Sequence, residues 1–365
     1  MAGASCALFM GGTPGHSSLS MTELLKHPDW QPPSNWQKIT TIEMHTGGEP
    51  LRIFMTGLPP IKGSTVLEKR RYFREHYDHI RRGILWEPRG HADMYGAIIT
   101  PSVDADLDVF FLHNEGYSTM CGHAIIALTK FVFETGILSK KDDEAKVVFN
   151  VPAGKVHAQA IIENGRVRES SFRNVPSFLY LDDQQVEVPG LGMVRFDVAY
   201  GGAFYAFVAA EPLGLSLTTN DYSKLIDYGR RIKKAVARNF PIQHPFESDL
   251  SFLYGTIFTG RAQTSEHHSR NVCVFADGEV DRSPTGTGVS ARAAIHHKRR
   301  ELKLNEKITI ESIVGSVMTV RAVEVTKFGP HDAVIPEVSG TASITGRSEF
   351  YFDPDDPFCE GFILR

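Results

Sequence analysis

The sequence predicts an α+β protein of two related units, and three observations lead to this prediction. Segments of strand-like composition dominate the chain, and segments with helical periodicity are few. Residues 120–136 and 281–300 share one plan: a turn, a cysteine or threonine, a glycine, and a helix rich in apolar or small residues. These two segments lie about 160 residues apart, which indicates one copy of the unit in each of two domains.

Composition indicates a globular protein that acts on a small molecule. The 365 residues suffice for two domains, and the 42% hydrophobic and 22% charged residues are ordinary values for a soluble protein. No apolar stretch has the length of a membrane span, so we expect a soluble protein without a membrane partner. The net charge is −4 and the basic residues are scattered, which disfavours nucleic acid as a partner.

Cysteine usage favours a reducing, cytoplasmic compartment. The four cysteines are too few and too widely spaced for a disulfide framework or a CxxC metal site. The histidine pairs at 267–268 and 296–297 are adjacent rather than spaced as metal ligands, so we expect no bound metal. Residues 1–20 lack Arg and Lys, and the apolar run at 7–10 is too short for the core of a signal peptide, so we expect residues 1–37 to be a flexible extension.

Strands and turns are expected from residue 39 onward. The segment "ITTIEMHTGGEPLRIF" at 39–54 is typical of two strands joined by a turn at Gly47 and Gly48. Charged and aromatic residues at helical spacing then predict a helix over 69–85. Further β-rich segments, interrupted by Gly, Pro or Asn, are expected at 94–100, 108–114, 146–167 and 194–210.

Residues 122–136 predict a helix that is buried on all sides. Apolar side chains cover nearly every direction around its axis, and Gly136 is placed to end it. A second helix is expected from Thr285 onward, with small residues in its first turns and a basic cluster near its end. If the two helix N-termini face each other, their free N–H groups make a strong anion site.

Several motifs together resemble those of the proline racemase family. The two helix-start motifs are "MCGHAIIAL" at 120–128 and "DRSPTGTGVSA" at 281–291. Five further motifs strengthen the match: "HTGGEPLR", "EPRGHADMYGA", "LHNEGYSTMCGH", "GGAFYAFV" and "LYGTIF". The resemblance runs from about residue 39 to the C-terminus.

The resemblance implies a fold similar to that of diaminopimelate epimerase. Such a fold has two pseudo-symmetric domains, each with a mostly antiparallel sheet wrapped around a central helix, and an active site between them. The chain end often returns to the first domain in this family, so we expect a first domain of 38–195 plus about 342–365. The second domain is then 196–341, and a homodimer is expected because homodimers are usual among relatives.

The resemblance also assigns roles to individual residues. Racemases of this family carry a cysteine in both helix-start motifs, whereas this chain has Cys121 in the first and Thr285 in the second. That arrangement resembles the family members that dehydrate trans-3-hydroxy-L-proline, and it implies a cofactor-free hydro-lyase. Cys121 is then the catalytic base, with a pKa tuned toward neutrality by the helix N-terminus. The implied substrate contacts are the backbone amides of Gly122, His123, Gly286 and Thr287 for the carboxylate, Asp281 and the His123 side chain for the ring ammonium, and Tyr95 and Phe275 for the ring.

The stereochemistry of that substrate accounts for the threonine. In trans-3-hydroxy-L-proline the Cα hydrogen and the hydroxyl share one ring face, so one thiol can take the proton and return it to the leaving hydroxide. The expected product is Δ2-pyrroline-2-carboxylate, which tautomerises to Δ1-pyrroline-2-carboxylate. A racemase needs a second acid on the far face, and the Thr285 hydroxyl is too weak an acid for that role.

Each of these assignments has a structural alternative. Thr285 can be a plain N-cap, Asp281 a turn residue, and His123 a hydrogen-bonded core residue. Tyr95 and Phe275 can be ordinary core aromatics.

Three other functions remain open from the sequence. The first is an oxidoreductase that binds a dinucleotide, because residues 286–291 match the GxGxxA form of a dinucleotide fingerprint. Several residues separate this motif from the preceding strand, however, and the chain lacks βαβ alternation. A 4-hydroxyproline epimerase or a proline racemase would use water or another group in place of the second thiol. A non-enzymatic relative would only bind imino acids.

Overall fold

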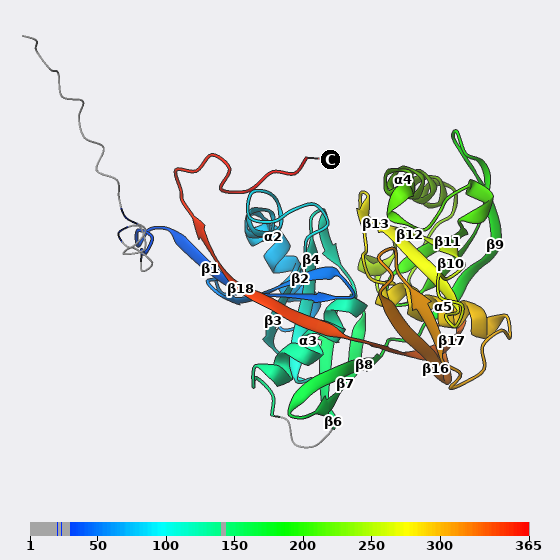
Figure 1. Cartoon of the computed structure of the whole chain (residues 1–365), viewed down its shortest axis with the longest axis horizontal. Coiled ribbons are helices and arrows are strands. Elements are labelled where there is room, and N and C mark those ends of the chain that lie inside the picture. Colours follow the sequence, from blue (N-terminus) through cyan, green and yellow to red (C-terminus); the bar gives the residue numbers. More distant parts are fainter. Residues whose placement is uncertain (1–19, 21–22, 24–29, 140–143, 365) are drawn as a thin grey trace, which may run out of the picture.

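The structure is a computed structural model, and it describes residues 20, 23, 30–139 and 144–364. Most of the expected extension, residues 1–37, lies outside the described residues, so its flexibility stays a prediction. Figure 1 shows two halves side by side, with helix α3 in one and helix α5 in the other. Strands dominate both halves, which confirms the expected α+β class.

The first half contains nine strands and two helices. In chain order they are β1 (Gln37–Thr46), β2 (Glu49–Thr56), α2 (Val66–Leu85), β3 (Tyr95–Pro101), β4 (Leu107–His113), β5 (Gly116–Ser118), α3 (Gly122–Glu134), β6 (Glu144–Val151), β7 (Gly154–Glu163), β8 (Arg166–Arg173) and β9 (Phe178–Val188). The hairpin expected at 39–54 is present as β1 and β2, with Gly47 and Gly48 at positive φ in its turn.

The second half has the same content in the same order. It comprises β10 (Gly192–Tyr200), β11 (Phe204–Ala209), α4 (Tyr222–Asn239), β12 (Leu253–Gly260), β13 (Ser269–Phe275), β14 (Glu279–Val280), α5 (Gly286–Lys298), β15 (Ile308–Glu311), β16 (Val317–Phe328), β17 (His331–Gly340) and β18 (Ala342–Phe352). Short 3₁₀ helices lie at Glu211–Leu213, Thr219–Asp221 and Ser248–Leu250.

Strand pairing in the first half recurs nine strands later in the second half. In the first, β2 pairs with β3 and β4 with β6 in parallel, while β3–β4, β6–β7 and β7–β8 are antiparallel. In the second, β11 pairs with β12 and β13 with β15 in parallel, while β12–β13, β15–β16 and β16–β17 are antiparallel. The expected pseudo-symmetry of the two units is therefore confirmed.

The last strand of each half pairs with the first strand of the other. β18 is antiparallel to β1 along nearly its whole length, and β9 is antiparallel to β10. The pairing of β18 supports the proposal that 342–365 belongs with the first domain. The boundary expected between residues 195 and 196 falls inside β10, so we propose instead that the second domain begins after β8 and includes β9.

Helix α3 is enclosed on all sides, as its sequence predicts. Its residues from Gly122 to Thr129, and Phe131 to Phe133, are buried, and they share one core cluster with strands of both halves. Thr135 is the C-cap and Gly136 follows at a φ of 75°, where a residue with a side chain would be strained. Because α3 is apolar in every direction, it is stable only where sheet surrounds it.

Helices α2 and α4 lie on the outer faces of the two halves (Figure 1). α2 begins with a capping box of Thr65 and Glu68 and buries Phe73, Ile80 and Ile84 against the first sheet. α4 was not anticipated, although its buried residues recur at helical spacing: Leu225, Gly229, Ile232 and Val236. Among the described helices, none is long and apolar enough to cross a membrane.

Candidate active site

The N-termini of α3 and α5 meet at the centre of the molecule. A Cβ atom built on Gly122 would lie 2.5 Å from the Cα atom of Gly286, and a Cβ atom on Gly286 would lie equally close to the Cα atom of Gly122. Only glycine permits this approach of two backbones. The first amides of both helices, which have no carbonyl of their own helix to bond, are thereby brought to one place.

A methyl group at this contact is expected to push the two helices apart. Gly122→Ala should lower the free energy of unfolding by about 3 kcal/mol, because its Cβ meets backbone rather than a movable side chain. Urea unfolding followed by circular dichroism measures the change. Gly346→Ala is the control, since a Cβ atom on Gly346 meets nothing within 4 Å. Equal stability of the two variants would contradict the close contact.

A narrow cavity opens beside the meeting helices. Its volume is about 280 Å³, part of which is open to solvent. All nine residues expected at the site line it, together with three that were not anticipated: Tyr95, Cys121, Gly122, His123, Phe275, Asp281, Thr285, Gly286 and Thr287, and in addition Met120, Tyr205 and Tyr254. Both halves contribute, so the site lies between them as expected.

Cys121 is the N-cap of α3 and is 5% exposed. Its Sγ atom accepts a hydrogen bond from the Ala124 N–H at 3.4 Å and lies 3.1 Å from Nδ1 of His123. Burial raises the pKa of the Cys121 thiol well above its ordinary value, and the Ala124 amide opposes this less strongly. The expectation of a near-neutral pKa is therefore wrong for this structure, because burial outweighs the helix N-terminus.

The side chain of His123 is neutral in this environment. Burial lowers its pKa to about 3, so the imidazole carries no charge at neutral pH. One nitrogen of a neutral imidazole can accept a hydrogen bond. The ring lies edge-on to Tyr95, with 4.9 Å between ring centroids. The Thr46 hydroxyl donates to the His123 carbonyl at 2.8 Å, which fixes the backbone at the start of α3.

Asp281 lines the cavity, and the carboxyl group of Glu49, which is not part of the lining, is close enough to Asp281 to feel its charge. Burial raises the pKa of Asp281 to about 6, although its Oδ1 accepts the Ser283 N–H at 2.7 Å. Glu49 is fully buried, and its pKa is raised well above the usual value, first by burial and then by the charge of Asp281. Oε2 of Glu49 accepts the Arg282 N–H at 2.7 Å. Two crowded carboxyl groups favour a bound cation.

Thr285 occupies the N-cap position of α5, but its side chain makes no capping hydrogen bond. Its hydroxyl is buried and has no hydrogen bond of ordinary geometry to a described residue, but it lies close enough to Asp281 to lower the pKa of that carboxyl. The backbone adopts φ 70° and ψ 97°, which a β-branched residue rarely does. The structural alternative, a plain N-cap, thus agrees with the position of Thr285 at the start of α5, but the Thr285 side chain does not cap the helix.

Aromatic rings form part of the cavity wall. Tyr254 packs on Phe275 with 5.4 Å between ring centroids, and Tyr95 lies edge-on to Phe275 at 6.2 Å. The Tyr205 hydroxyl shares a hydrogen bond of 2.7 Å with Oγ1 of Thr287, which joins this wall to the start of α5. Within the part of the chain that the structure describes, no cluster of three potential metal ligands occurs.

The glycines of the GxGxxA pattern have structural roles. Gly286 contacts Gly122, and a Cβ atom on Gly288 would lie 2.4 Å from Cδ1 of Ile257. β13 and β15 pair in parallel on either side of α5, but the strand directly before α5 is the short β14, which is antiparallel to β13, and residues 281–285 separate it from Gly286. The dinucleotide alternative thus lacks its structural context.

Comparison with known proteins identifies the family. A family model described as proline racemase matches residues 41–363. The chain belongs to the proline racemase family. A protein of Colwellia psychrerythraea named trans-3-hydroxy-L-proline dehydratase is 52% identical over 346 residues, which cover 93% of this chain and 98% of that protein. A human protein of the same name is 46% identical over 357 residues, which cover 96% and 99%.

A solved structure of the family has the same fold. The hydroxyproline epimerase of Agrobacterium vitis, with bound trans-4-OH-L-proline, superposes with a TM-score of 0.86 at 28% identity. The match covers 91% of this chain and 96% of that one. The epimerase-like architecture expected from the motifs is therefore confirmed.

The site residues that sequence reasoning missed lie inside motifs that it used. Tyr205 is part of "GGAFYAFV" and Tyr254 part of "LYGTIF", yet both occupy strands where aromatic residues are usual. Glu49, which lies outside the cavity lining, belongs to "HTGGEPLR" and accepts a hydrogen bond from the Arg282 N–H in the loop before α5. Their motifs were the available signal, but which strand face lines the cavity depends on the fold.

Proposed function

We propose that this chain is a trans-3-hydroxy-L-proline dehydratase that eliminates water to give Δ2-pyrroline-2-carboxylate without a cofactor. One observation carries the proposal: a single thiol, Cys121, begins one central helix, while an alcohol, Thr285, holds the equivalent place in the other. The names of the bacterial and human relatives support the same substrate and reaction.

The substrate carboxylate binds between the two helix N-termini. The amides of Gly122 and His123 from α3, and of Gly286 and Thr287 from α5, supply N–H donors from both halves. Both helix dipoles place their positive ends at this point. As the Cα proton leaves, negative charge grows beside the carboxylate, and these fixed donors stabilise it in a site with little water.

The ring ammonium binds at Asp281 and at the neutral imidazole of His123. Asp281 supplies the negative charge, and His123 supplies a hydrogen-bond acceptor without adding a repelling positive charge. A cation bound here also favours the thiolate of Cys121, which lowers the pKa that burial and Asp281 raise. The substrate itself thus helps to ionise the base.

Cys121 then acts on one face of the ring. The thiolate takes the Cα proton, the electron pair forms the Cα–C3 double bond, and the C3–O bond breaks with its electrons on oxygen. The new thiol gives its proton to the leaving hydroxide, so water departs and the thiolate is restored. Thr285 takes no part in proton transfer, because an alcohol is far too weak an acid near neutral pH.

Incubation in deuterated water with two substrates tests this function. Trans-3-hydroxy-L-proline should yield a pyrroline carboxylate, detected by chemical reduction to proline and by NMR. L-proline should yield no D-proline, because a second acid on the far face is absent from the proposed mechanism. D-proline formed at a comparable rate would overturn the role of Thr285 and favour a racemase.

Two further features complete the proposal. We expect a homodimer, as in relatives, which sedimentation measures directly. We also expect a cytoplasmic location, which rests on the few, widely spaced cysteines; Cys121, Cys273 and Cys359 are free.

A further inference from the structure

The hydroxyl of Tyr254 stands out among the polar groups of the cavity. Tyr254 lies in β12, is 6% exposed and lines the same cavity as Cys121. Its hydroxyl is buried and has no hydrogen-bond partner of ordinary geometry among the described residues. A buried phenol normally finds such a partner, and leaving it without one costs about 1–3 kcal/mol.

The neighbouring hydroxyls are already engaged. Tyr205 shares its hydroxyl hydrogen bond with Thr287, and Tyr95 shares one with Ser118. The Tyr95 hydroxyl lies near the Tyr254 oxygen and acts on it as a donor, which lowers the pKa of Tyr254. Of the three tyrosines that line the cavity, Tyr254 is therefore the one whose own O–H donates to no described residue and is available to a bound molecule.

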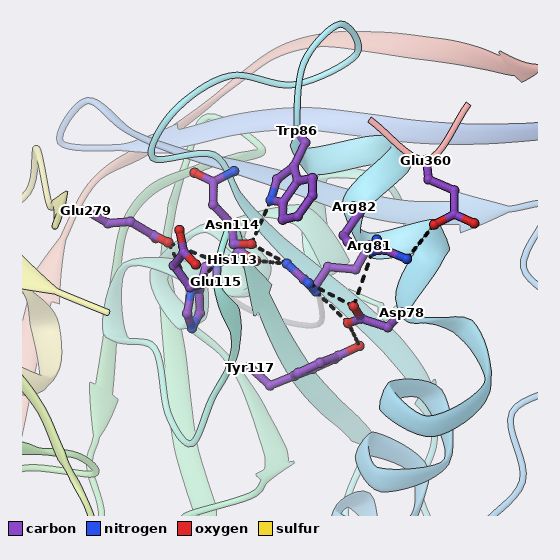
Figure 2. A network of polar contacts seen from close by, with 10 residues as sticks. All are labelled: Asp78, Arg81, Arg82, Trp86, His113, Asn114, Glu115, Tyr117, Glu279 and Glu360. Carbon is purple, nitrogen blue, oxygen red and sulfur yellow. Dashed lines mark hydrogen bonds and ion pairs between the residues drawn. The ribbon is translucent and has the colours of Figure 1, made fainter. Parts of the chain in front are cut away.

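The ring of Tyr254 is held in place from several sides. It packs on Phe275, and it lies edge-on to Tyr205 and to His113, with 5.8 and 5.9 Å between ring centroids. His113 is fixed in turn, since its Nδ1 lies 3.1 Å from Oε1 of Glu279 (Figure 2). The hydroxyl thus cannot turn toward solvent without disturbing this packing.

A polar network stabilises the wall behind His113. Figure 2 shows His113 of the first half and Glu279 of the second pointing toward one another, with Asn114 and Arg81 beside them. The Glu115 N–H also donates to Oε1 of Glu279 at 3.2 Å, and Arg81 donates to the carbonyls of His113 and Asn114. The aromatic wall is therefore rigid across the junction of the halves.

The phenol of Tyr254 stays protonated and lies close to the catalytic thiol. Burial is the main cause that raises its pKa well above the ordinary value, and neighbouring ionisable groups, among them Glu279, add to this, while the Tyr95 hydroxyl opposes it. A neutral O–H near Cys121 can donate a hydrogen bond without competing as a base.

We propose that the Tyr254 hydroxyl donates a hydrogen bond to the 3-hydroxyl oxygen of the substrate and stabilises it as the C3–O bond breaks. This inference rests on the proposed dehydratase function. Tyr254 keeps its own proton throughout, and the proton that completes the water molecule still comes from the Cys121 thiol. Tyr254 thereby selects substrates with a leaving group on C3, on the face that Cys121 attacks.

Tyr254→Phe with two leaving groups tests the role. Trans-3-fluoro-L-proline loses fluoride, which departs as the anion and needs less help from a donor, while the thiol proton goes to solvent. We expect kcat for trans-3-hydroxy-L-proline to fall about 10²-fold to 10³-fold and fluoride release to fall less than tenfold. KM should change little, since the carboxylate and ammonium contacts remain.

Tyr200→Phe is the matched control. Tyr200 is a fully buried tyrosine whose hydroxyl has no partner among the described residues either, but it lies in the separate core cluster of the second half. Its substitution should change neither rate.

Equal losses for both leaving groups in Tyr254→Phe, or no loss for the hydroxyl substrate, would overturn the inference. A wild type that dehydrates the natural substrate but releases no fluoride would also count against it. Failure of the wild type to dehydrate trans-3-hydroxy-L-proline would instead contradict the proposed function itself.

Discussion

Cys121→Ser is expected to lower kcat for trans-3-hydroxy-L-proline by about 10³-fold or more, because the serine hydroxyl is far too weakly acidic to supply an anionic base. The fold should persist. Serine oxygen can still accept the Ala124 N–H that Sγ accepts now, and serine is a favoured N-cap. Pyrroline carboxylate formation measures the loss.

Substrate binding should survive this change. The amides and Asp281 that hold the substrate are untouched, so trans-3-hydroxy-L-proline should still raise the melting temperature of the variant. Cys359→Ser is the control, since Cys359 lies in the C-terminal segment, away from the cavity. Full activity of Cys121→Ser would eliminate Cys121 as the base, and with it the one-thiol mechanism.

Local sequence patterns were sufficient to predict the central helices of the fold. Helix α3 is apolar around its whole circumference, and in a globular protein such a helix is stable only when other elements bury it on all sides. Helix α4 was missed because its sequence, "YSKLIDYGRRIKKAVARN", is strongly charged. Charged residues lie between its apolar residues, so their helical spacing is visible only when the positions are counted.

The residues of the site could be predicted from the sequence, but the pKa of Cys121 and the backbone conformation of Thr285 could not. Cys121 and Thr285 each begin a helix in a recognisable motif, so their convergence followed from the repeat. The raised pKa of Cys121 could not be predicted, since burial dominates it and Asp281 and Glu49, both distant in sequence, add to it. The positive φ of Thr285 was likewise not predicted, since β-branched residues rarely adopt it.

Asp281→Asn is expected to stabilise the protein at neutral pH while it removes activity. Burial raises the pKa of Asp281 from 3.8 to about 6, so ionisation of this group is harder in the folded protein than in the unfolded chain. A shift of this size costs about 3 kcal/mol at pH 8, and asparagine, which does not ionise, avoids that cost. Its side-chain oxygen can still accept the Ser283 N–H, and its amide group can donate to the Thr285 hydroxyl, which lies beside Asp281.

The sign of the effect sets its pH dependence. A raised pKa means that the folded protein binds the proton more tightly, so the contribution of Asp281 to stability is present below pH 3.8 and is lost as pH rises through 6. The advantage of Asp281→Asn in urea unfolding should therefore be largest at pH 8 and fall to roughly half at pH 5.

The kcat/KM of Asp281→Asn should drop about 10²-fold or more, because the ring ammonium loses its counter-charge. If the gain in stability were independent of pH, the ionisation of Asp281 would not be what destabilises the folded protein. If kcat/KM were unchanged, Asp281 would not bind the substrate. A carboxylate kept buried at such a cost is expected only where a cation must bind.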